Sequence, residues 1–286
     1  MTRIAHLSDL HLIEADPRAR SIAGRLRLSL LTLGRRPDPI DRARRATRAL
    51  REAFEAKADH LVLTGDLTED GTDEQLRELA RILRSSPWPA HRITLVPGNH
   101  DAYADGGAWS RALAGPLASW APTSEPGSVT RVGEASIVAV STAFHQSIGR
   151  SAGRVAPSLM RRIADVVSDR SQRGRAVLLA QHHGPIDRGA AHWLDGLEEH
   201  DAQSALGRVH EELHVLCGHA HRVSDHALYP GGERRVFTAP AVVDAARPLR
   251  LYRVEGGCLV PDSTRIDGVT VARALARALL EDAAAC

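Results

Sequence analysis

The stretch Val96-Pro97-Gly98-Asn99-His100-Asp101 decides how this sequence folds. It completes an apolar run, residues 91–96, that is typical of a buried strand, and Pro97-Gly98 end that strand. An amide, an imidazole and a carboxylate then follow directly. In open α/β sheets, ligands bind just beyond the carboxyl ends of strands. The stretch therefore predicts a functional site at one end of a sheet.

The same pattern recurs four more times along the chain. Each predicted strand is followed at once by carboxylates or imidazoles. The strands and their polar residues are, in order, 4–8 with Asp9 and His11, 61–64 with Asp66, 176–180 with His182 and His183, and 213–217 with His219 and His221. One such residue alone is more often a turn or cap residue than a ligand. Five sets in series predict one metal-binding cluster.

This ordered series, D-x-H, G-D, G-N-H-D, H-H-x-P and G-H-x-H, resembles the calcineurin-like metallophosphoesterase family from Ile4 to about His221. The resemblance implies an α/β fold, a four-layer α-β-β-α sandwich of two mixed sheets flanked by helices, with the metal site at one end of the strands. It also implies hydrolysis of a phosphate ester by a hydroxide that bridges two metal ions.

The resemblance further implies a role for each matching position. The metal ligands would be Asp9, His11 and His221 for the first ion, Asp66 as the bridge, and Asn99, His182 and His219 for the second. His100 would stabilise charge on the phosphoryl oxygens or protonate the leaving alkoxide, and Asp101 would orient His100. His183, with Asn99 and His100, would contact the substrate. Counting the H-H-x-P motif back from Pro185 instead selects His183 as the ligand in place of His182.

The ligand types also constrain the metal. Carboxylates, an amide oxygen and imidazoles, without thiolates, favour Mn, Fe, Zn or a mixture of them over a structural zinc site. The candidates exceed what one ion can use, so we expect two ions roughly 3.5–4 Å apart. Cys217 lies beside the cluster, where we expect a small buried residue rather than a ligand.

Length and composition set the remaining limits. The 286 residues suffice for a single domain, 1–286, with a substantial core. A net charge of +2 and 3% aromatic residues give no strong signal for a nucleic-acid partner. The first strand begins too early for a signal peptide, and the three cysteines show no C-x-x-C spacing. We therefore expect a cytoplasmic protein.

A Leu/Arg-rich insertion at about 15–37 separates His11 from the first long helix. One interpretation is a short helix packed on the body with a solvated basic edge. The other is an amphipathic lid beside the metal site, in which the 21–36 segment contacts a lipid, a membrane surface or an anionic substrate. Its departure from the loop that carries Asp9 and His11 favours some role near the site.

Local patterns predict the other elements. Asp38 before Pro39 predicts the start of a long helix, and Thr72 with Gln75 forms a capping box that opens the next one. We also expect strands at 135–140, 235–239 and 249–254, helices at 157–167, 201–209 and about 268–284, an irregular helix at 103–120, a loop at 121–127 and a polar loop, 186–201, that rims the site. Structural roles are expected for His6, His60, His91 and His214.

The substrate class follows from the resemblance. We expect a phosphodiesterase that acts on a small phosphate ester. The alternatives are a phosphomonoesterase or pyrophosphatase acting on a nucleotide or lipid-linked substrate, and, as the weakest, a non-catalytic scaffold with the same fold.

Overall fold

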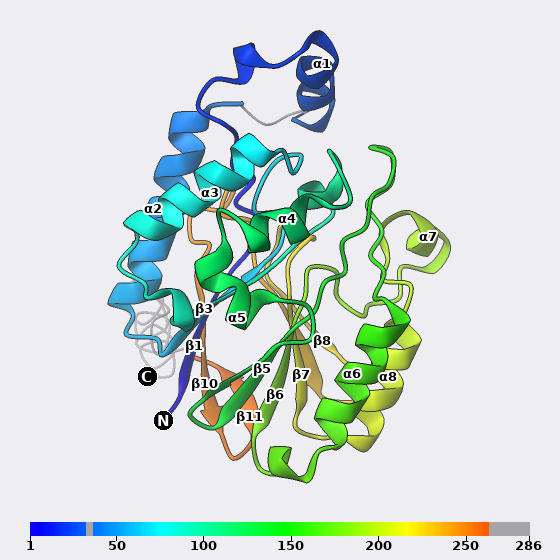
Figure 1. The fold of residues 1–286 in the computed structure, drawn as a ribbon. Coiled ribbons are helices and arrows are strands. Elements are labelled where there is room, and N and C mark those ends of the chain that lie inside the picture. The colour runs from blue at the N-terminus through cyan, green and yellow to red at the C-terminus, as the bar shows by residue number, and fades with distance from the viewer. Residues whose placement is uncertain (33–36, 263–286) are drawn as a thin grey trace, which may run out of the picture.

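The computed structural model describes residues 1–32 and 37–262. Two mixed β-sheets pack face to face, and helices cover their outer faces (Figure 1). The expected α-β-β-α sandwich is therefore confirmed. The parallel strands run from the end of the molecule that carries the N-terminus toward the end that carries α1, Ile22–Leu31 (Figure 1).

The first sheet has the strand order β11-β10-β1-β2-β3. Strands β1, β2 and β3 are parallel, whereas β10 is antiparallel to β1 and β11 to β10. Their bounds are Arg3–Leu7 for β1, His60–Thr64 for β2, Ile93–Val96 for β3, Arg250–Glu255 for β10 and Cys258–Pro261 for β11. The three parallel strands therefore direct Asp9, Asp66 and Asn99 to one edge.

The second sheet has the strand order β4-β5-β6-β7-β9-β8. The four central strands are parallel, and the antiparallel strands β4 and β8 form the two edges. The bounds are Val129–Val132 for β4, Ala135–Ala139 for β5, Ala176–Ala180 for β6, Leu213–Cys217 for β7, Ser224–Ala227 for β8 and Arg234–Thr238 for β9. Strands β6 and β7 end at the histidine pairs.

Three apolar layers hold the sandwich together. The layer between the sheets includes Ile4, Val62, Leu178 and Tyr252, all fully buried. A second cluster lies under the helices of the first sheet, and a third under those of the second. The helices are α2 (Pro39–Glu55), α3 (Asp73–Ser85), α4 (Ala108–Ala114) and α5 (Ala121–Ser124) on the first side and α6 (Pro157–Ser168), α7 (His192–Asp195) and α8 (His200–Val209) on the other.

The predicted helix starts are observed. The Asp38 carboxylate accepts hydrogen bonds from the backbone N–H of Ile40 and Asp41 at the start of α2. Thr72 caps α3 by accepting from the Gln75 N–H at 3.4 Å. The other half of the expected capping box is missing, because the Gln75 side chain accepts from Asp70 N–H instead. Gln75 thus joins a buried network that the local pattern did not indicate.

Other sequence predictions need correction. The strand expected at 91–96 begins only at Ile93, since 90–92 form a 3-10 turn. The loop expected at 121–127 begins with the short helix α5, in which Thr123 Oγ1 donates to the Ile93 carbonyl. Strands β4, β8 and β11 were not predicted. The C-terminal helix expected at about 268–284 lies outside the described residues.

Candidate metal centre

The predicted ligands come together at one end of the sandwich. They follow the carboxyl ends of β1, β2 and β3 in one sheet and of β6 and β7 in the other. Their ligand atoms form groups whose members all lie within 4.8 Å of one another, namely Asp9-His11-His221, Asp9-Asp66-His182, His11-Asp66-His100 and His182-His183-His219. The groups overlap through Asp9, His11, Asp66 and His182, so these four groups form one connected cluster.

The separations within the cluster are those of atoms that share a cation. Asp9 Oδ1 lies 3.2 Å from His221 Nε2, and His11 Nε2 lies 3.4 Å from the same nitrogen. His182 Nε2 lies 3.2 Å from Asp66 Oδ2. Two atoms that each bind a metal at about 2.0–2.2 Å are roughly 3–3.5 Å apart. The observed spacing therefore fits metal coordination.

Several buried polar atoms of the cluster have no hydrogen-bond partner in the described parts of the chain. They are Asp9 Oδ1, Asn99 Oδ1 and His182 Nε2. A buried polar atom without a partner costs roughly 1–3 kcal/mol, so such atoms are rare unless they serve a ligand. The Asn99 amide is oriented by Nδ2, which donates to Tyr103 Oη at 3.0 Å. The hard oxygen and imidazole atoms left over suit a divalent cation.

Hydrogen bonds hold the ligand imidazoles so that Nε2 faces the cluster. His182 Nδ1 donates to the Thr64 carbonyl at 2.7 Å, and His221 Nδ1 lies 2.8 Å from Asp244 Oδ2. His11 Nδ1 lies 3.4 Å from the buried carboxylate of Glu69. A partner on the second nitrogen fixes the tautomer and the direction of a metal-binding histidine. Sequence reasoning missed both Glu69 and Asp244.

The two neighbouring histidines after β6 differ in what their nitrogens do. Nδ1 of His183 is 2.8 Å from Thr142 Oγ1, and its Nε2 donates to the Ser151 carbonyl at 2.9 Å. Both nitrogens of His183 are therefore engaged within the protein. His182 Nε2 instead faces the carboxylate of Asp66, another predicted ligand, at 3.2 Å. This difference favours the alternative in which His182 is the ligand.

The expected contact between Asp101 and His100 is absent, and that interpretation is wrong. The buried Asp101 carboxylate accepts from the N–H groups of Leu67, Thr68 and Gly98, and from Thr68 Oγ1. It therefore joins the loops after β2 and β3. The residue that orients His100 is Glu69, whose carbonyl accepts from His100 Nδ1 at 2.7 Å.

Backbone strain is concentrated at the cluster. Among the described residues, six that are not glycine have a positive φ, and five of them are predicted ligands, namely Asp9 (57°), His11 (48°), Asp66 (48°), His219 (69°) and His221 (53°). A left-handed conformation at such residues costs on the order of 1–3 kcal/mol and is typical of functional sites. The fold thus holds the ligand-bearing loops in a conformation that these residues rarely adopt.

In the cluster, burial and the neighbouring charges shift the pKa values of the carboxylates and imidazoles in opposite directions. Burial opposes ionisation of Asp9, but the neighbouring His221 and His182 outweigh it and lower the Asp9 pKa to about 2. Burial likewise disfavours a charged His182, but Asp66 outweighs it and raises the His182 pKa to about 9. The acids therefore keep their negative charge in a buried site, and that charge attracts cations.

The comparisons with known proteins agree with this geometry. A family model described as calcineurin-like phosphoesterase matches residues 2–223. The chain belongs to the calcineurin-like phosphoesterase family. Membership confirms the expected class of chemistry, the metal-dependent hydrolysis of phosphate esters. The match covers all five strands that carry ligands and ends two residues after His221.

A solved structure supports the fold. The crystal structure of a dimetal phosphatase from Danio rerio is similar to this phosphoesterase with a TM-score of 0.62 and 14% sequence identity. The likeness covers 88% of this chain and 92% of the other. At this identity the comparison supports the sandwich fold, and it gives no information about the substrate. No curated protein sequence matches the chain.

The polar segment 186–201 lies beside the metal centre of this phosphoesterase. The Leu194 carbonyl accepts from Ser151 N–H at 2.9 Å, and Glu198 binds the guanidinium groups of Arg150 and Arg154. Ser151 in turn receives the hydrogen bond of His183 Nε2. The segment therefore supports the wall of the centre, in line with its expected position.

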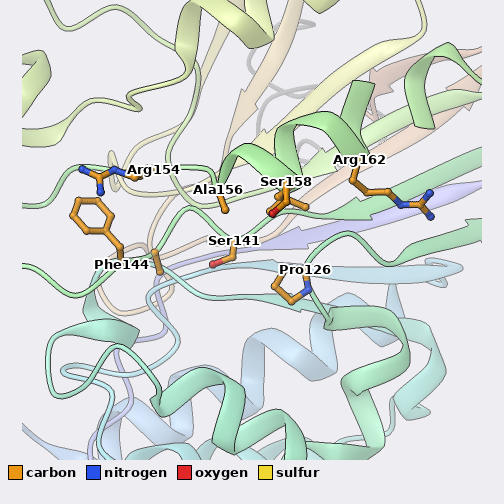
Figure 2. Close-up of a pocket in the computed structure, with 9 residues that line it drawn as sticks. Pro126, Ser141, Phe144, Arg154, Ala156, Ser158 and Arg162 are labelled. Carbon is orange, nitrogen blue, oxygen red and sulfur yellow. The ribbon is translucent and has the colours of Figure 1, made fainter. Parts of the chain in front are cut away.

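A hollow of about 520 Å³ lies next to this wall (Figure 2). At one end, the guanidinium of Arg154 lies 4.7 Å from the ring centre of Phe144. The other lining residues are Pro126, Ser141, Ala143, Ala156, Ser158, Leu159 and Arg162. None of the predicted metal ligands lines the hollow. One lining residue, Ser141, directly precedes Thr142, the hydrogen-bond partner of His183.

Of the four histidines expected to have structural roles, His6, His60 and His214 form internal hydrogen bonds, whereas His91 is exposed. His6 Nε2 is 2.8 Å from Thr64 Oγ1, and His60 Nε2 is 2.9 Å from Thr94 Oγ1, both between neighbouring strands. His214 Nε2 accepts from Leu259 N–H. Cys217 is fully buried, and burial raises the pKa of its thiol to about 11. The expectation that Cys217 is a small buried residue is confirmed.

Proposed function

We propose that this protein is a phosphodiesterase whose active centre holds two metal ions. The observation that carries the proposal is the position of Asp66. Its Oδ2 lies 3.2 Å from His182 Nε2 on one side and 3.9 Å from His11 Nε2 on the other. One carboxylate oxygen thus reaches both ligand groups, as a bridge between two ions requires.

In this proposal the ligands divide at Asp66. Asp9, His11 and His221 hold one ion, and Asn99, His182 and His219 hold the other. The set fits Mn, Fe, Zn or a mixture of these. When bound, two such ions lower the pKa of a shared water toward neutrality and neutralise charge on the phosphate.

His100 is the proposed acid. Its Nδ1 carries a hydrogen, because the Glu69 carbonyl can only accept. Nε2 lies 4.0 Å from Asp66 Oδ2 and therefore faces the centre. In its protonated form, Nε2–H can donate to a phosphoryl oxygen or to the leaving alkoxide.

The experiment is hydrolysis of bis-p-nitrophenyl phosphate with added Mn. His100→Ala should lower turnover about 10²–10⁴-fold, as loss of a general acid does, while the bound metal stays unchanged. The control is His91→Ala, since His91 is exposed and lies just before β3, at the amino end of that strand. Equal hydrolysis by His100→Ala and the control would reject His100 as the acid.

The second candidate is a phosphomonoesterase. The description of the Danio rerio protein as a phosphatase favours it. Comparing bis-p-nitrophenyl phosphate with p-nitrophenyl phosphate on one metal-analysed preparation separates the two candidates. A higher kcat/KM for the monoester would replace the diesterase proposal, and turnover of neither ester with Mn, Fe or Zn would favour a non-catalytic role.

A further inference from the structure

Helix α1 exposes a row of large apolar side chains. Ile22, Leu26 and Leu30 are 78%, 62% and 48% exposed, and their spacing of four places them on one face. Leu28 and Leu31 are buried on the opposite side, where the helix packs on the protein. A helix that is apolar on both sides is typically buried on both sides. The outer face of α1 therefore lacks a partner among the described residues.

Positive charge predominates in the segment that carries this face, although the exposed Asp16 lies beside Arg18 and Arg25. Residues 17–37 contain six arginines and no aspartate or glutamate. Arg18 and Arg25 are exposed, and neither forms an ion pair with the described part of the chain. An apolar row flanked by arginines without ion pairs is complementary to a surface that has an apolar interior beneath a layer of anionic groups.

Two other arginines fasten α1 to the protein. Arg20 binds the buried Asp70 carboxylate through both terminal nitrogens, at 2.9 and 2.8 Å, and also pairs with Glu14. Arg27 Nε donates to the same Asp70 at 2.8 Å. The helix is thus held in place with its apolar row outward, so no large rearrangement is needed to present that row.

The face lies at the end of the molecule that carries the metal centre. Asp70 directly follows Glu69, which binds His100. Trp193, in α7, is 67% exposed and precedes Leu194, whose carbonyl accepts from Ser151 in the wall of the centre. Tryptophan is enriched where a protein meets the boundary between lipid and water. Both α1 and α7 stand toward this end in Figure 1.

We propose that α1 docks this protein on an anionic phospholipid bilayer. Ile22, Leu26 and Leu30 enter the boundary between headgroups and acyl chains, and Arg18 and Arg25 bind the lipid phosphates. The helix lies in the plane of the membrane, and the metal centre faces the same surface. Docking does not depend on which phosphate ester is hydrolysed.

The test is sedimentation of the full chain with vesicles of phosphatidylcholine alone or mixed with phosphatidylglycerol. The protein should bind the anionic vesicles, and added salt should weaken binding. The double variant Ile22→Asp/Leu26→Asp should bind at least about tenfold more weakly, because it removes buried apolar area and adds negative charge. Arg25→Glu should weaken binding about tenfold as well.

The matched control is Val209→Asp. Val209 is 71% exposed and ends α8, just before β7 begins, at the opposite end of the strands. Val209→Asp should bind as the unchanged protein does, and all variants should keep its unfolding temperature. The proposal is overturned if the unchanged protein does not bind anionic vesicles, or if the double variant binds equally well. Ultracentrifugation showing that the row instead joins two copies of the chain would also overturn it.

Discussion

The Asp66 carboxylate occupies the space that a side chain at position 98 would fill. A Cβ atom at Gly98 would lie 2.2 Å from Asp66 Oδ1 and 2.4 Å from its backbone nitrogen. The Asp66 backbone can shift only at a large energetic cost. Gly98→Ala must therefore displace the proposed bridging ligand. We expect kcat/KM for an aryl diester to fall about 100-fold, the typical effect of a 1 Å misplacement. Steady-state kinetics with metal analysis measures it.

A second glycine provides the control for Gly98→Ala. A Cβ atom at Gly149 would meet nothing within 4 Å. Gly149→Ala should therefore leave both kcat/KM and metal content unchanged. If Gly98→Ala behaves like Gly149→Ala, the close approach of Gly98 to Asp66 does not matter for catalysis.

At the residue scale, the sequence pattern predicted the polar residues that follow each strand. It did not predict the residues that contact and orient those ligands. Glu69 and Asp244 lie in no repeated motif and reach His11 and His221 only through the folded chain. Asp101 was misread because it is adjacent to His100 in sequence. Residues 100–102 form a 3-10 turn, and the two side chains leave it in different directions.

At the scale of elements, the attachment of α1 rests on a buried ion network. Arg20 lies between the carboxylates of Glu14 and Asp70, and all three side chains are at most about one-tenth exposed. Arg20→Met leaves the buried Glu14 carboxylate without a cation and leaves Asp70 with Arg27 alone. Removing one partner of a buried pair costs about 3–5 kcal/mol. We expect the free energy of unfolding to fall by about that amount, as measured by urea denaturation.

An exposed pair serves as the comparison for Arg20. Arg81 pairs with Glu78 along α3, and its side chain is 62% exposed. Such pairs contribute about 0–1 kcal/mol, so Arg81→Met should change stability little. Similar losses for the two variants would show that the network does not hold α1.

Elements with a strong local pattern were predictable and weakly buried ones were not. Helices α2 and α6 begin at Pro39 and Pro157, where the pattern placed them. Strands β4 and β8 are only partly buried, so they lack the apolar run that indicates a strand. Gln75 matched a capping box, but tertiary partners at Glu14 and Asp70 outcompeted the local hydrogen bond.

At the scale of the whole molecule, the centre joins the two sheets. Asp9, Asp66 and Asn99 come from the first sheet, whereas His182 and His219 come from the second. The order of the ligand sets along the chain predicted that they meet, through the resemblance to a known family. The face-to-face packing that brings them together depends on contacts such as Ile4 with the second sheet, which no local pattern encodes.

None of the described helices has the length and apolar character needed to cross a membrane.

Because the ligands come from both sheets, metal binding should stabilise the entire fold. A ligand that binds only the folded state at a hundredfold excess over its Kd contributes about 2.7 kcal/mol. For a chain of this size, that corresponds to a rise of roughly 5–10 °C in Tm. Chelation should therefore lower Tm and added Mn should restore it, as followed by scanning calorimetry. Asp66→Ala should lose most of the response, since Asp66 reaches both ligand groups. Equal Tm values for chelated and Mn-loaded protein would mean that the cluster holds no tightly bound ion.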